Sequence, residues 1–241
     1  MKIGAISYCY HRLELPALLA NFKEIGLKNI ELWRGHPDGR ANFMERDRHQ
    51  AQDTRALIEG YGIAPQAYCI GGFTANDAPH FRRAFEFASG LGVEVMTGCA
   101  VPEILPELDR LCQEYQIRFA IENHRGNPFQ GPDDYVAAFQ TTSPMIGVNF
   151  DTGHLRAAHL EVVESARKLL DRIYHVHLKD IADPATAGTC VLGQGVAHIG
   201  EFLELMKARG YRGHLSIEHE IAADPTEDLR QCLAFVAQHV A

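Results

Sequence analysis

Short β-rich runs alternate eight times with helical segments along this chain of 241 residues. Repeated strand–helix units of this kind build a parallel sheet, because each helix returns the chain to the edge where the next strand starts. The runs expected to form strands are residues 2–8, 29–33, 63–69, 93–99, 118–123, 146–150, 173–178 and 215–218. The expected helices cover residues 15–25, 45–59, 77–89, 102–115, 132–140, 160–170 and 200–209, with a last helix beginning at Pro225.

Eight such units without a linker or a break in composition predict a single α/β domain, residues 1–241, folded as a (β/α)₈ TIM barrel. A doubly wound open sheet is the alternative. We prefer the barrel because neither GxGxxG nor GxxxxGK, the glycine patterns of phosphate-binding loops in open sheets, follows the first strand.

The composition excludes several classes of partner. A net charge of −8 and the lack of a long basic run argue against nucleic acid. No stretch reaches the roughly 20 apolar residues of a membrane span. The six cysteines are scattered without a CxxC pair, which favours reduced thiols in the cytosol over a disulfide framework. We therefore expect a cytoplasmic protein without a membrane partner, and leave a homo-oligomer open.

Polar residues interrupt the apolar pattern where four of the expected strands end. In the seventh strand, Val176 and Leu178 alternate with two histidines and a lysine. A packed core does not accept such side chains without partners, so this face of the strand is expected to end at a site. Three other strands end with a carboxylate on the face opposite their apolar residues. The four polar residues are Glu122, Asp151, His177 and Glu218.

These four residues belong to the fifth, sixth, seventh and eighth strands, which are neighbours in a TIM barrel. Function in that fold sits at the C-terminal ends of the strands, so the four side chains are predicted to converge on one divalent metal ion. Three carboxylates and one imidazole form a hard, mostly oxygen shell. Such a shell suits Mn²⁺, Mg²⁺ or Co²⁺, with Zn²⁺ as an alternative.

The segments around these residues resemble the xylose isomerase-like TIM barrels, a superfamily that includes inosose isomerases and dehydratases, hydroxypyruvate isomerase, ketose 3-epimerases and endonuclease IV. The segments are Ile121-Glu122-Asn123-His124, Asp151-Thr152-Gly153-His154, His175-Val176-His177-Leu178-Lys179-Asp180, Leu192-Gly193-Gln194-Gly195 and Ser216-Ile217-Glu218-His219-Glu220. The resemblance implies a barrel with the same four residues as metal ligands.

The resemblance also implies roles for single residues. Glu122 and Glu218 are expected to shuttle protons as the catalytic pair. His154 is expected to contact substrate, with Gly153 allowing a sharp turn that brings it over the metal. Lys179 is expected to hold a substrate oxygen.

One departure from the superfamily concerns its trinuclear-zinc endonucleases. These carry ligand histidines at the ends of strands three and four, where this chain has Cys69 and Cys99. The departure argues for one metal ion and against phosphodiester cleavage.

Several further residues have two readings. His175 is expected to support the metal site or the core rather than to bind metal. His124 lines the pocket or caps its loop, and Glu31 and Trp33 point inward, with Trp33 as a pocket wall. Arg34 and His36 either reach substrate or lie in a solvated loop. Three cysteines at strand ends either form a thiolate zinc site or are simply buried thiols: Cys9, Cys69 and Cys99.

The leading functional hypothesis is a metal-dependent isomerase or epimerase of a small sugar, ketose or cyclic polyol. Proton transfer would pass through a metal-stabilised enediolate. An inosose-type or keto-acid dehydratase could use the same site. An endonuclease IV-like phosphodiesterase and a non-catalytic sugar-binding barrel are further alternatives.

Overall fold

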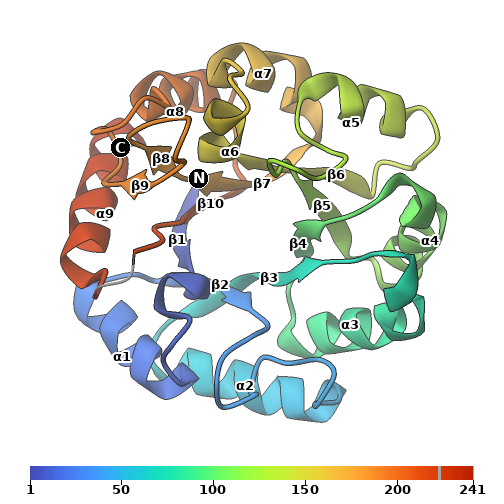
Figure 1. Ribbon diagram of the computed structural model, residues 1–241. Coiled ribbons are helices and arrows are strands. Elements are labelled where there is room, and N and C mark those ends of the chain that lie inside the picture. The colour runs from blue at the N-terminus through green and yellow to red at the C-terminus, as the bar shows by residue number, and fades with distance from the viewer. Residues whose placement is uncertain (222–223, 241) are drawn as a thin grey trace.

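Eight parallel strands close into a barrel in the computed structural model, which describes residues 1–221 and 224–240 (Figure 1). The order around the barrel is β1-β10-β7-β6-β5-β4-β3-β2. This closure confirms the predicted fold class and rules out an open doubly wound sheet. The barrel strands are β1 Lys2–Ile6, β2 Asn29–Trp33, β3 Ala64–Gly72, β4 Val95–Cys99, β5 Arg118–Glu122, β6 Ile146–Asp151, β7 Ile173–Leu178 and β10 His214–Ile217.

A ring of helices surrounds the strands (Figure 1). The helices are α1 Leu15–Ile25, α2 Arg48–Gly60, α3 Ala78–Leu91, α4 Leu105–Tyr115, α5 Pro132–Phe139, α6 Thr152–Ala157, α7 Val162–Leu169, α8 Ile199–Ala208 and α9 Thr226–Val240. Apolar side chains on the outer faces of the strands pack against this ring, as where Phe150 of β6 stacks on Phe202 of α8 with 5.2 Å between ring centroids. Among the described residues, no helix combines the length and the apolar character that crossing a bilayer requires.

Two elements beside the barrel mouth depart from the expected pattern. Helix α6 begins directly after β6, where a turn was expected. The segment after β7 lies outside every expected strand and helix, but it contains a small antiparallel hairpin, β8 Asp180–Ile181 and β9 Thr189–Cys190. The Asp180 carboxylate accepts hydrogen bonds from the backbone N–H groups of Gly193, Gly195 and Ala197, at 2.9–3.0 Å. It thereby fixes the end of this segment beside the last barrel strands.

The register of the strands brings the polar strand ends together. Asp151 of β6 is paired with His177 of β7, and His177 with Ser216 of β10. Glu122 of β5 is paired with Asn149, two residues before Asp151. The site therefore follows from the closure of the barrel and from where each strand ends.

Candidate metal centre

Glu122, Asp151, His177 and Glu218 form one buried cluster at the barrel mouth. One side-chain oxygen or nitrogen from each of the four lies within 4.8 Å of the others. The His177 Nδ1 atom is 2.9 Å from Glu218 Oε2, 3.5 Å from Glu122 Oε1 and 3.7 Å from Asp151 Oδ2. None of the four residues is more than 7% exposed. The structure thus brings together all four residues predicted as ligands.

Local hydrogen bonds aim Asp151 at this cluster. The Asn123 side-chain amide donates to the Asp151 carbonyl at 2.8 Å, and its oxygen accepts from the Asp151 N–H at 2.9 Å. Asp151 Oδ1 accepts from the N–H of His154 at 2.6 Å, which caps helix α6. The other oxygen, Oδ2, is buried without a hydrogen-bond partner in the described part of the chain, and it faces His177.

The donor set fits a divalent cation. A buried carboxylate oxygen without a donor is costly unless a cation faces it. Burial alone would lower the pKa of His177, but Glu31 and Glu218 outweigh burial and raise it well above its ordinary value. The surrounding carboxylates thus stabilise positive charge on the His177 ring, and three of them lie around its Nδ1 atom. Three carboxylates and an imidazole are ligands that Mg²⁺, Mn²⁺ and Zn²⁺ accept.

One cavity opens on the cluster, and a second cavity adjoins the first through shared lining residues. The first, about 230 Å³ in volume, is lined by Glu122, His177, Glu218, Trp33, His124 and His154, together with Tyr8, Cys69, Cys99 and Glu220. The second, about 200 Å³, shares His124, His154 and Glu220 and adds Lys179 and the β8–β9 hairpin. All four residues predicted to bind substrate therefore line a cavity beside the cluster. Tyr8 and Glu220 were missed, although Glu220 lies two residues after Glu218, on the same face of an extended chain.

Lys179 and His154, which line these cavities, differ in charge. Burial would lower the pKa of Lys179, but Glu218, Asp151 and Glu220 raise it well above its ordinary value, so the ammonium stays charged. Its Nζ atom lies 3.4 Å from Glu218 Oε1 and forms an ion pair with Glu220. Burial lowers the pKa of His154, so its imidazole is neutral at neutral pH.

The expected reason for the position of His154 was wrong. Gly153 does not make a turn with a positive φ angle; it lies in the first turn of α6. A Cβ atom at Gly153 would lie 2.7 Å from Lys179 Cγ, so glycine is needed for the close approach of that side chain. His154 reaches the cavity from α6, and its ring lies 3.8 Å from the ring of His124, centroid to centroid.

Replacing His154 with alanine should leave metal binding intact and lower turnover by roughly 10²-fold or more, as for loss of a group that acts on the reacting atoms. The reason is that His154 faces the cavity with its ring, whereas only its backbone N–H contacts a predicted ligand. Metal content and turnover, measured on the same preparation, check this. Unchanged turnover would contradict the role of His154, and loss of metal would make it a ligand.

His36 is buried, so the reading of it as a solvated loop residue was wrong. It is 3% exposed and lines neither of the two cavities beside the cluster. Its Nδ1–H donates to the Leu13 carbonyl at 3.1 Å, and its Nε2 accepts from the Ser7 hydroxyl at 2.8 Å. Ser7 in turn accepts from the N–H of Trp33, so this chain of hydrogen bonds links the ends of β1 and β2.

Stability should fall in acid because of His36. Burial lowers its pKa in the folded chain to about 4 from an ordinary value of 6.5. As the pH falls through this window, the unfolded chain takes up the proton first, so up to about 3 kcal/mol is lost between pH 6.5 and 4. Urea unfolding of His36→Gln across this range should show a flatter pH dependence than wild type. His49→Gln on the exposed surface of α2 is the control, and equal slopes in wild type and His36→Gln would contradict the assignment.

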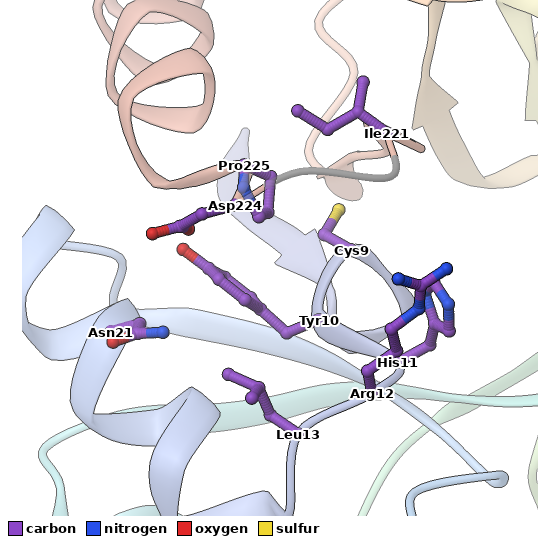
Figure 2. Close-up of a pocket in the computed structure, with 9 residues that line it drawn as sticks. All are labelled: Cys9, Tyr10, His11, Arg12, Leu13, Asn21, Ile221, Asp224 and Pro225. Carbon is purple, nitrogen blue, oxygen red and sulfur yellow. The ribbon is translucent and has the colours of Figure 1, made fainter.

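The cysteines at the strand ends form no thiolate cluster within the described residues. Cys69 and Cys99 line the cavity beside the candidate metal centre, and burial raises the pKa of both thiols. Cys9 is buried on the rim of a separate cavity of about 320 Å³, between the segment after β1 and the start of α9 (Figure 2). The reading as buried thiols is therefore confirmed for Cys9 and Cys69, whereas Cys99 is only partly buried. None of the four predicted ligands lines the separate cavity beside Cys9.

Comparisons with known proteins agree with the fold. A family model described as xylose isomerase-like TIM barrel matches residues 19–239. Inosose dehydratase from Bacillus anthracis (strain CDC 684 / NRRL 3495) is 27% identical over 209 residues, covering 76% of this chain and 67% of the relative. The chain spans about half the length of two other curated relatives, the inosose dehydratases from Histophilus somni and Glaesserella parasuis, each covered to 45%.

Solved structures share the same architecture. The IolI protein with a bound zinc atom aligns over 100% of this chain and 98% of its own, with a TM-score of 0.81 and 17% identity. L-ribulose 3-epimerase aligns over 99% and 94%, with a TM-score of 0.79 and 17% identity. At 17% identity, these two structures show that the folds are alike. The match to the family model shows that the chain shares its descent with that family. The chain belongs to the xylose isomerase-like TIM barrel family.

Proposed function

We propose that the chain is a divalent-metal-dependent isomerase or epimerase of a small sugar, ketose or cyclic polyol. The observation that carries the proposal is the buried cluster of Glu122, Asp151, His177 and Glu218 beside a cavity sized for a small ligand. One solved structure with a similar fold is named L-ribulose 3-epimerase, and this name supports the same class of reaction.

The four clustered residues would hold the metal ion. When bound, a divalent ion supplies a Lewis acid that polarises a substrate carbonyl and makes the adjacent C–H bond more acidic. Glu122 and Glu218 both line the cavity, so one carboxylate can remove a proton and the other can return it. Lys179 stays charged and serves as a hydrogen-bond donor to a substrate oxygen, while neutral His154 can donate or accept.

A dehydratase acting on an inosose is the second candidate. Several curated relatives are named inosose dehydratase, and this observation favours it. Both reactions begin by removing a proton next to a carbonyl. They differ in the following step, which returns the proton for an isomerase or expels a hydroxyl group as water for a dehydratase.

A screen of ketoses and inososes with Mn²⁺, read by product NMR and mass spectrometry, tests the proposal. An isomeric product of unchanged mass supports the isomerase or epimerase. A product lighter by one water supports the dehydratase. Tight binding of metal and ligand without any turnover would contradict both and make the chain a sugar-binding barrel.

A further inference from the structure

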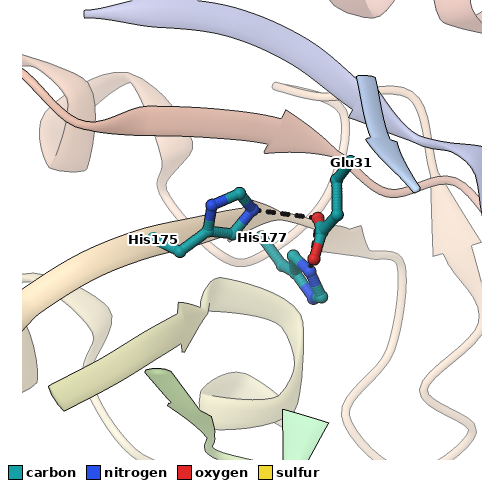
Figure 3. Close-up of side chains that lie close together, drawn as sticks. All are labelled: Glu31, His175 and His177. Atoms are coloured by element: carbon teal, nitrogen blue, oxygen red, sulfur yellow. Dashed lines mark hydrogen bonds and ion pairs between the residues drawn. The ribbon is translucent and has the colours of Figure 1, made fainter. Parts of the chain in front are cut away.

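A buried carboxylate stands behind the imidazole of His177. Glu31 of β2 is 1% exposed, and its Oε2 atom lies 2.9 Å from His177 Nε2 and 2.9 Å from His175 Nε2 (Figure 3). Its other oxygen accepts from the Thr97 hydroxyl on β4. Two of the three donors come from β7 and one from β4, so the Glu31 side chain of β2 links three separate strands inside the barrel.

These contacts fix which nitrogen of His177 faces the predicted ligands. A carboxylate only accepts hydrogen bonds, so Nε2 of His177 carries a proton and donates it to Glu31. Nδ1 is then the atom that offers a lone pair, and it is the atom nearest to Glu122, Asp151 and Glu218. Glu31 thus selects the tautomer that a metal ion at the cluster requires.

His175, two residues before His177 on β7, also restrains the Glu31 carboxylate. Its Nε2–H donates to the oxygen that His177 also uses, and its ring meets that of His177 edge to face, with 5.6 Å between centroids. Two imidazoles and one hydroxyl therefore satisfy Glu31. Without Glu31, the Nε2–H groups of both fully buried histidines would lose their acceptor.

We infer that Glu31 is a positioning residue that holds His177 in the tautomer and orientation needed to bind a divalent ion through Nδ1. The inference rests on the proposed function, because it assumes a metal ion among the four clustered residues. Outer carboxylates of this kind also make the ligand imidazole a stronger base. Glu31, His175 and His177 lie close enough to hold an ion themselves, so the test must count ions as well as measure affinity.

Calorimetric titration with Mn²⁺ of wild type and Glu31→Gln tests the inference. Glutamine has the same shape, so its oxygen can still accept from an imidazole while its amide faces the Thr97 hydroxyl. The variant loses only the charge. We expect one ion per chain in both proteins and an affinity about 10–100-fold weaker in Glu31→Gln.

Thr97→Val is the matched control, because it removes a hydrogen bond to the other oxygen of the same carboxylate and leaves the charge in place. Its affinity should stay within about threefold of wild type, since the contact with His177 remains. Equal affinities for Mn²⁺ in wild type and Glu31→Gln would overturn the inference. Such a result would still be consistent with a metal ion bound by the four clustered residues. Two ions in wild type and one in the variant would also overturn the inference, by making Glu31 a ligand.

A measurement on wild type alone covers the case in which Glu31→Gln does not fold. With Co²⁺ bound, the Nε2 proton of His177 should give a paramagnetically shifted NMR signal that exchanges slowly in D₂O, because this atom is buried against Glu31. A wild-type chain that binds Co²⁺ without such a signal would overturn the inference. A wild-type chain that binds no divalent ion would overturn the proposed function along with it.

Discussion

Replacing His177 with alanine should weaken the binding of a divalent ion by more than about 100-fold, because outer-shell changes alone cost roughly 10–100-fold. The variant loses one of four ligands. It also leaves Glu122, Asp151 and Glu218 facing one another without the imidazole, so their mutual repulsion grows. Calorimetric titration with Mn²⁺ measures the effect directly.

The control for this experiment is His49→Ala on the exposed surface of α2, which should bind the ion as wild type does. Circular dichroism of both variants shows whether the barrel is intact. A folded His177→Ala chain with wild-type affinity would place the ion elsewhere and remove His177 from the site.

Glu122→Gln and Glu218→Gln should each lower turnover by about 10²–10⁴-fold when measured at saturating metal. Glutamine keeps the shape and one ligand oxygen of each residue but cannot take up a proton. The reaction is run in deuterated water, and metal content is measured in each variant. Wild type should introduce deuterium at the reacting carbon, because the carboxylates exchange their protons with solvent.

Glu201→Gln, on the exposed surface of α8, is the control for a charge change away from the site. It should leave both turnover and deuterium uptake unchanged. Normal turnover in both site variants, with metal still bound, would exclude Glu122 and Glu218 as the acid–base pair and leave them as ligands only.

Much of the barrel could be predicted from the sequence because strand and helix patterns are local. The bounds of β2, β7 and α1 agree with the expected ranges. In each of these elements the apolar residues recur at a regular spacing, and the pattern ends clearly. Helix α6 was missed because Asp151-Thr152-Gly153-His154 was read as a glycine turn. In the structure, Asp151 caps a helix and the glycine makes room for Lys179.

The cluster of four predicted ligands followed from polar residues at the ends of successive strands, which a closed barrel makes neighbours. The contacts of Glu31 behind this cluster could not be predicted in that way. Glu31 was expected only to point inward, because its partner His175 lies 144 residues away and no local pattern joins the two. His36 was misread for the same reason, since its burial depends on Ser7 and Leu13 from another strand–helix unit.

We expect Glu122, Asp151, His177 and Glu218 to hold one divalent ion together. Crystals grown with Mn²⁺ and measured for anomalous scattering test this arrangement of ligands. They should show one peak per chain, within roughly 2.0–2.3 Å of an atom from each of the four side chains and bonded to Nδ1 of His177. A chain whose only peak lies elsewhere, or that binds no Mn²⁺ at all, would contradict this expectation.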